Sequence, residues 1–99
     1  MSSKLTFYEK RLEDDGSVIE MKVWEVTPSE KSPDGVKYSL YWVNGEKVFV
    51  GYDNHHPKGH HRHYGEREES YEFTTIENLI RDFLEDHRRI RHESQKNSD

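Results

Sequence analysis

The sequence contains no cysteine among its 99 residues. This absence excludes disulfide bonds, cysteine–zinc sites and thiol nucleophiles. Strongly apolar residues are also few, because leucine, isoleucine, valine and phenylalanine together number twenty, close to the composition at which chains remain disordered. No apolar run approaches the length of a membrane span, and residues 1–10 are too polar for a signal peptide. We therefore expect a cytoplasmic protein that does not enter a membrane.

The arrangement of the apolar residues nevertheless predicts a folded protein. They fall in patterned segments, and six tyrosines and two tryptophans add large apolar surfaces for few rotatable bonds. A chain of this length fits one domain. We expect that domain over residues 1–91, followed by a frayed polar tail over residues 92–99. The formal net charge of −5 argues against a general DNA-coating protein, which would be basic.

Four segments that are rich in β-forming residues predict strands. They are residues 5–11, 18–27, 36–43 and 47–53. Between the last two, a three-residue loop ending with Gly45 in the left-handed conformation would pair Leu40 with Val48 and Tyr38 with Val50. This register collects most apolar side chains on one face and points Asp53 away from it. Residues 71–73 predict a short edge strand.

A helix is predicted after this edge strand. Thr74 and Glu77 have the spacing of a capping box, and apolar residues then recur at helical spacing as far as residue 91. His87 lies within the apolar stripe and is expected to be a packed, hydrogen-bonded histidine. The predicted fold is therefore α+β, an antiparallel sheet of four to five strands covered on one face by the C-terminal helix. The stripe consists of Ile76, Leu79, Ile80, Phe83, Leu84 and Ile90.

The most unusual segment is residues 54–70, which has no apolar periodicity and is predicted to be one long loop. Five of the seven histidines lie within it, and loops of this length in small domains are usually functional or disordered. Pro57 and Gly59 would bend the backbone and bring the histidines together. These histidines are His55, His56, His60, His61 and His63.

Acid–base chemistry on RNA is one interpretation of this cluster. Attack by a 2′-hydroxyl needs a base and the leaving oxygen needs an acid, and histidine suits both roles near neutral pH. Asp53 would orient a histidine, Lys58 and Arg62 would hold the phosphate, and Tyr64 would stack on a base or supply a hydroxyl. On this interpretation no metal is required.

A metal site is the second interpretation. In an extended chain His61 and His63 share one side, a spacing that suits zinc, nickel or copper, and Asp53 or Glu66 would complete the shell. The wider set of candidate ligands is His55, His56, His60, His61 and His63. The third interpretation is a solvated polar loop, because a cluster in the sequence defines no geometry.

At these residues the chain resembles the TumE family of toxins from toxin–antitoxin systems. The resemblance runs over residues 4–91 and is carried by residues 35–40, 52–54, 58–64, 71–73 and 79–83. Its most specific part is Asp53-Asn54 followed within a short loop by His61-Arg62-His63. The resemblance implies a growth-inhibiting toxin, encoded beside an antitoxin that carries a DNA-binding domain. It also implies a site made of Asp53, Asn54, His61, Arg62 and His63.

The leading hypothesis is therefore an RNA-cleaving toxin with an RNA substrate and a cognate antitoxin. Its candidate catalytic residues are Asp53, His61 and His63, and its candidate substrate-binding residues are Asn54, Lys58, Arg62 and Tyr64. The alternative is a non-catalytic module that uses the same histidines to bind zinc, nickel or a partner. The sequence leaves a homodimer open.

Overall fold

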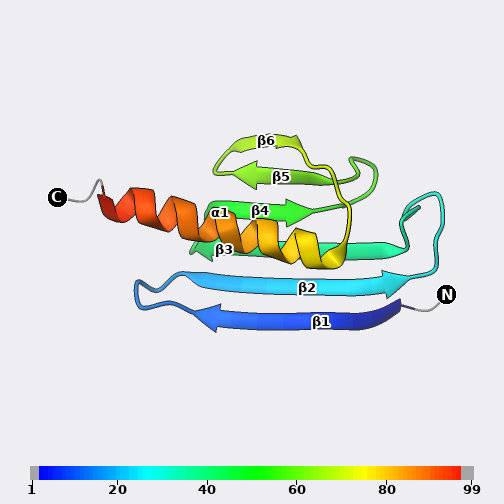
Figure 1. The fold of residues 1–99 in the computed structure, drawn as a ribbon, viewed down its shortest axis with the longest axis horizontal. Coiled ribbons are helices and arrows are strands. Elements are labelled where there is room, and N and C mark those ends of the chain that lie inside the picture. Colours follow the sequence, from blue (N-terminus) through cyan, green and yellow to red (C-terminus); the bar gives the residue numbers. More distant parts are fainter. Residues whose placement is uncertain (1–2, 97–99) are drawn as a thin grey trace.

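The computed structural model describes residues 3–96, which form one antiparallel sheet and one helix (Figure 1). The six strands lie in the sheet in their order along the chain, so that each strand pairs with the next. The predicted α+β class is confirmed, with six strands instead of four to five. The elements are β1 (Ser3–Leu12), β2 (Val18–Val26), β3 (Val36–Asn44), β4 (Lys47–Asp53), β5 (His61–Tyr64), β6 (Arg67–Ser70) and α1 (Ile76–Lys96).

The register between β3 and β4 differs from the predicted one. Leu40 lies opposite Tyr52 instead of Val48. The chain turns at Gly45 and Glu46, between the paired Asn44 and Lys47, and Gly45 has the positive φ that the sequence predicts. A two-residue turn alone would misplace the apolar set, but a bulge follows it and returns Val50 and Tyr52 to the core face.

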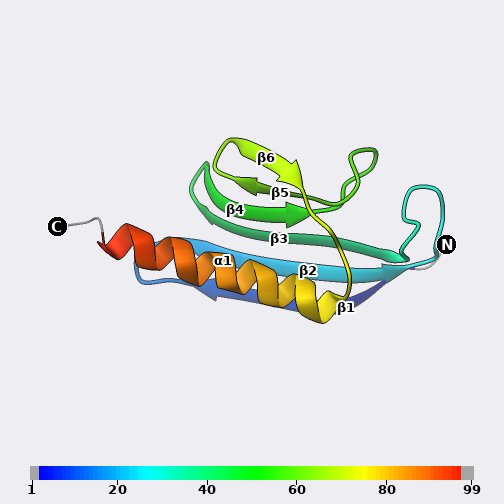
Figure 2. The same ribbon diagram turned by 45° about the horizontal axis from the view of Figure 1, so that its top comes forward.

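Helix α1 packs along one face of the sheet (Figure 2). The side chains of Leu79 and Phe83 are fully buried against the apolar face of β2, β3 and β4. The cap lies one residue later than predicted, because the Thr75 Oγ1 accepts the backbone N–H of Asn78 at 3.0 Å. The buried core comprises Ile19, Met21, Val23, Val36, Tyr38, Leu40, Trp42, Val50, Tyr52, Tyr71, Leu79 and Phe83.

Helix α1 runs to Lys96, so residues 92–96 of the predicted tail are helical. Residues 97–99 of the predicted tail lie outside the described part of the chain. His87 is packed as expected, since its ring meets Trp42 edge-on with centroids 4.5 Å apart and its Nε2 lies against the Glu13 carboxylate.

Residues 54–70 are not one long loop. A short loop over residues 54–60 leads into a hairpin, β5–β6, that extends the sheet beyond β4. Residues 71–73, predicted as a strand, are irregular. The error has a physical cause: β5 alternates in the ordinary way, but its core-facing residues are Arg62 and Tyr64, which hydrophobic periodicity does not register.

The sheet therefore has two unlike faces. We call the side covered by α1 the helix face and the opposite side the open face. Within residues 3–96, no helix or strand covers the open face. The strand pairings place one row of cross-strand neighbours on it, formed by Lys22, Ser39, Asp53 and His61, and beside it a second row, formed by Glu20, Tyr41, Gly51 and His63.

Candidate active site on the open face

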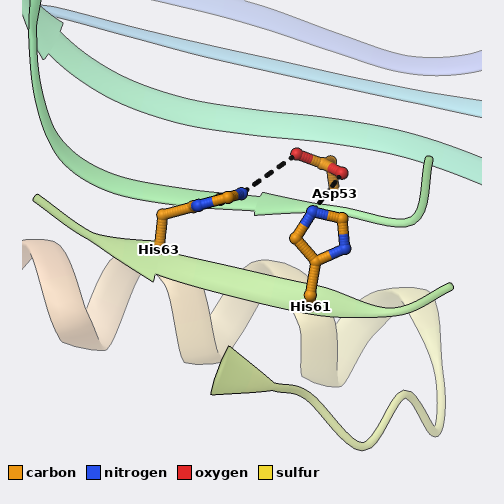
Figure 3. A group of neighbouring side chains, drawn as sticks. All are labelled: Asp53, His61 and His63. Atoms are coloured by element: carbon orange, nitrogen blue, oxygen red, sulfur yellow. Dashed lines mark ion pairs between the residues drawn. The ribbon is translucent and has the colours of Figure 1, made fainter. Parts of the chain in front are cut away.

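The centre of the site is a carboxylate between two histidines (Figure 3). Asp53 ends β4 and lies directly opposite His61, the first residue of β5. The His61 Nε2 lies 2.9 Å from the Asp53 Oδ1, and both side chains are largely buried, with 8% and 14% of their surfaces exposed. The His61 Nδ1 donates to the carbonyl of Gly59 at 2.8 Å. That hydrogen bond leaves Nε2 as the nitrogen that faces the carboxylate.

His63 lies two residues further along β5 and on the same face. Its Nε2 is 3.6 Å from the other oxygen of Asp53, Oδ2. The rings of His61 and His63 meet edge-on with centroids 4.9 Å apart. His63 is the more accessible of the two, with 23% of its side chain exposed. The two histidines therefore flank one carboxylate, and His63 is the one that faces solvent.

Tyr41 of β3 also belongs to the site, although it was not among the residues predicted from the sequence. Its hydroxyl donates to the Asp53 Oδ2, and its ring stacks on that of His63 with centroids 6.2 Å apart. Burial, together with this hydrogen bond, raises the pKa of Tyr41 above its ordinary value, so the phenol keeps its proton at neutral pH. The side chain thus holds Asp53 in place as a hydrogen-bond donor.

Gly51 makes this arrangement possible. It lies opposite Tyr41 on one side and His63 on the other. A Cβ on Gly51 would overlap the ring of Tyr41. The signal in the sequence is a glycine inside a strand, which often marks a place where another group approaches closely.

Glu68 and Lys58 lie at the rim of the site. The Lys58 Nζ is 3.0 Å from both carboxylate oxygens of Glu68, and the Glu68 Oε2 is 3.8 Å from the His63 Nδ1. The hydrogen bond from Lys58 lowers the pKa of Glu68. Lys58 therefore lies at the rim of the site through Glu68, and Glu68 was missed because β6 was not predicted.

Two of the predicted substrate-binding residues point to the helix face. Arg62 and Tyr64 alternate with the two histidines along β5, and so lie on the opposite side of the sheet. The Arg62 Nε donates to Glu69 at 2.7 Å, and the Tyr64 hydroxyl donates to Asp86 of α1 at 2.6 Å. Arg62 and Tyr64 are therefore on the other side of the sheet from His61 and His63.

Asn54 is engaged in holding the chain. Its Oδ1 accepts the backbone N–H of Tyr38 at 3.0 Å, and its Nδ2 donates to the carbonyl of Val36 at 2.8 Å. The side chain therefore continues the ladder to β3 beyond the end of β4. Both of its polar groups are used for the fold.

The five histidines of the wider metal set do not converge. The His60 Nε2 is paired with Asp34 at 2.6 Å, and its ring stacks on Phe73 with centroids 4.9 Å apart. His55 and His56 are exposed. Within residues 3–96, the group with metal-ligand spacing is Asp53, His61 and His63, whose donor atoms all lie within 4.8 Å of one another.

Comparison with known proteins identifies the family. The family model described as toxin TumE matches residues 2–91, which is most of the chain. The chain belongs to the TumE toxin family. No curated protein and no solved structure matches it.

A TumE-family protein is the toxin of a toxin–antitoxin system, and this membership implies a cognate antitoxin as its partner. In the described part of this TumE-family toxin, residues 3–96, no helix is long and apolar enough to span a bilayer. Of the five site residues that the sequence resemblance implied, Asp53, His61 and His63 meet on the open face, whereas Asn54 and Arg62 support the fold.

Proposed function

We propose that this toxin cleaves RNA at the cluster of Asp53, His61 and His63, with the two histidines as general base and acid. The observation that carries the proposal is the pair of imidazoles, 4.9 Å apart and sharing one carboxylate, on a face that no other helix or strand within residues 3–96 covers. Histidine is the side chain whose ordinary proton affinity suits both halves of this reaction near neutral pH.

The proposed reaction is an internal phosphoryl transfer. The neutral His63, which is the more exposed ring, takes the proton of a ribose 2′-hydroxyl while the 2′-oxygen forms a bond to phosphorus. The bond from phosphorus to the 5′-oxygen breaks, and the protonated His61 transfers its Nε2 proton, which faces the Asp53 Oδ1 in the free protein, to that leaving oxygen. Asp53 orients both rings, and Tyr41 holds Asp53. The products are a 2′,3′-cyclic phosphate and a free 5′-hydroxyl.

Lys58 is the residue that we assign to the scissile phosphate. Its side chain is 64% exposed and lies on Glu68, which itself neighbours His63. A phosphate that displaced Glu68 from Lys58 would bring its negative charge next to His63 and gain a charge-assisted hydrogen bond. Arg62 is not assigned this role, since it faces α1.

The test is RNA cleavage by purified protein in the presence of EDTA. We expect His63→Ala and His61→Ala each to lower the rate about 100-fold or more, the usual size of a lost general acid or base. The matched control is His92→Ala, which removes an exposed histidine of α1 and should cleave like the wild type. Equal cleavage by all four proteins would refute the mechanism.

A metal site at the same three residues is the second candidate function. The spacing of their donor atoms favours it, and two imidazoles with one carboxylate are a donor set that zinc and nickel accept. The groups present therefore fit such an ion. On this proposal the protein binds zinc or nickel without any catalysis.

Metal analysis separates the two candidates. Retention of about one zinc or nickel ion per chain after gel filtration, lost in His61→Ala, would support the metal site. EDTA should leave RNA cleavage unchanged if the histidines act as acid and base. If EDTA abolished cleavage and zinc restored it, the result would instead indicate that a bound metal ion takes part in the reaction.

A further inference from the structure

Two adjoining grooves lead away from the cluster across the open face. The first is lined by Asp53 and Tyr41 and passes over Ser39 to Lys22 and Trp24. The second lies at the end of the same face and is lined by residues of the β2–β3 loop, by Lys31 and by His56. Lys37 and His55 line both grooves. The two therefore form one path, which we call the open-face groove.

The strand register gives the length of this path. Lys22, Ser39 and Asp53 are successive cross-strand neighbours, and Trp24 lies opposite Lys37 one row further along. Because adjacent strands lie about 4.8 Å apart, Lys22 is about 10 Å from Asp53 across the sheet. A polymer with one unit bound at Asp53 could therefore contact Trp24 and Lys37 with the next unit.

The charge of the groove is opposite to that of the whole chain. The protein has a formal net charge of −5, but the groove is lined by Lys22, Lys31, Lys37 and two histidines, and its one acidic lining residue within residues 3–96 is Asp53. The lining of the cavities along α1, by contrast, mixes acids and bases. Within residues 3–96, Lys31 and Lys37 form no ion pair with a carboxylate, whereas Lys22 pairs with Glu20 at 3.6 Å. A polyanion is therefore the occupant that this surface fits.

Trp24 adds a flat apolar surface to this positive path. It is partly exposed on the open face, whereas the other tryptophan, Trp42, is 3% exposed in the core. Lysines that surround an accessible aromatic ring are the features with which proteins bind single-stranded nucleic acid, because the ring stacks on a base while the lysines contact phosphates.

We propose that the open-face groove binds single-stranded RNA, with Trp24 stacked on a base next to the cleaved nucleotide and with Lys31 and Lys37 on the phosphates. The inference rests on the proposed function, because it gives the direction in which the substrate leaves the Asp53 cluster. To the proposed function it adds that the RNA substrate is single-stranded and that the open-face groove positions this RNA.

The first test measures binding without cleavage. A 2′-O-methyl RNA oligonucleotide lacks the attacking hydroxyl, so its affinity does not depend on the chemistry. We expect the double variant Lys31→Gln/Lys37→Gln to bind it about tenfold more weakly and to lower the salt slope of the affinity by about 1.4, or roughly 0.7 for each lost phosphate contact. The control, Lys10→Gln/Lys47→Gln, changes the net charge equally at lysines that do not line the groove, and should bind like the wild type.

The second test uses the fluorescence of Trp24. Added 2′-O-methyl oligonucleotide should quench part of the tryptophan emission of the wild type, and should leave the emission of Trp42 in a Trp24→Phe variant unquenched. Trp24→Phe should retain most of the affinity because phenylalanine also stacks, whereas Trp24→Leu should lose about tenfold. A duplex of the same sequence should bind more weakly, since its bases are not free to stack.

Several results would overturn the inference. One is equal affinity of the groove variant and the control variant for the 2′-O-methyl oligonucleotide. The others are unquenched Trp24 fluorescence and equal affinity for the single strand and the duplex. Loss of antitoxin binding in Lys31→Gln/Lys37→Gln with unchanged oligonucleotide binding would assign the groove to a protein partner instead. Groove-dependent binding of the oligonucleotide without any RNA cleavage would refute the proposed function alone. RNA cleavage that the groove variants leave unchanged would refute the groove alone.

Discussion

The two faces of β5 show how neighbouring residues of similar polarity acquire different roles. His61 and His63 point to the open face, where they flank Asp53. Arg62 and Tyr64 point to the helix face, where they contact Glu69 and Asp86. Alternation along one four-residue strand thus separates a candidate site from a set of structural contacts with β6 and α1, which we call the seam. Charge and hydrogen-bonding capacity alone do not tell which residues belong to the site and which to the seam.

The seam on the helix face replaces an apolar core at this edge of the sheet. The Arg62 guanidinium lies 5.4–5.9 Å from the ring centres of three tyrosines, Tyr52, Tyr64 and Tyr71. The hydroxyls of Tyr52 and Tyr64 both donate to Asp86 of α1. Aromatic rings and a cation therefore join β4, β5 and the helix where aliphatic residues are scarce.

The greatest loss of stability is expected from truncating Phe83 on the helix face. Phe83→Ala removes a fully buried ring that meets Tyr52 edge-on with centroids 5.8 Å apart. We expect the free energy of unfolding to fall by about 3–5 kcal/mol, a large share of the roughly 5–15 kcal/mol typical of a domain. Urea denaturation measures it. Val48→Ala, a truncation of a partly exposed valine that pairs with Val43, should cost less than about 1 kcal/mol. Similar losses in both variants would contradict the assignment of the core to the helix face.

A smaller change in the free energy of unfolding is expected for substitutions of two adjacent residues of β5. Arg62→Leu removes the bond to Glu69 and the contacts with the tyrosine rings, and should lower the free energy of unfolding by about 1–2 kcal/mol, since the guanidinium is partly exposed. His63→Leu should lower it by less, about 1 kcal/mol or below, because it loses only long contacts with Asp53 and Glu68.

RNA cleavage should be affected in the opposite order, with the larger loss in His63→Leu and the smaller in Arg62→Leu. Arg62→Leu is expected to cleave at the wild-type rate at a temperature where it is folded, and His63→Leu is expected to lose cleavage. Denaturation curves and cleavage rates measured on the same preparations test this. A folded Arg62→Leu protein without cleavage would place Arg62 in the site after all.

The smallest effect is a pH dependence at the other end of the helix face. Hydrogen bonds from Ser17, together with Arg91 of α1, lower the pKa of Asp15 to about 2 from its ordinary value of 3.8. A carboxyl whose pKa is lower in the folded state stabilises the protein at pH values above 3.8, and this contribution is lost as the pH falls toward 2. Asp15→Asn should therefore melt at a lower temperature than the wild type at pH 6, and the difference should narrow below pH 4. A constant difference from pH 6 to pH 2.5 would contradict this explanation.

Some of these features follow from local patterns in the sequence. The strands of the first two hairpins were predicted because their segments are rich in β-forming residues, and the C-terminal helix because its apolar residues recur at helical spacing. The side on which Asp53 lies was predicted too, since a strand alternates and its core face was recognisable. The β5–β6 hairpin was missed because the residues of β5 that face α1 are Arg62 and Tyr64, which are not aliphatic. The β3–β4 register was predicted wrongly because it contains a bulge, and a bulge depends on packing across strands.

The α+β class, the first four strands, the helix and the residues available for chemistry follow from the amino-acid sequence alone, because periodicity and composition act over a few neighbouring positions. Which histidines meet depends on the folded sheet. His61 and His63 reach Asp53 because β5 pairs with β4 in one register, and Tyr41 reaches it because Gly51 leaves room above the sheet. Those contacts join residues on different strands, 8 to 12 positions apart along the chain, and only the pairing of strands brings them within hydrogen-bonding and ion-pairing distance.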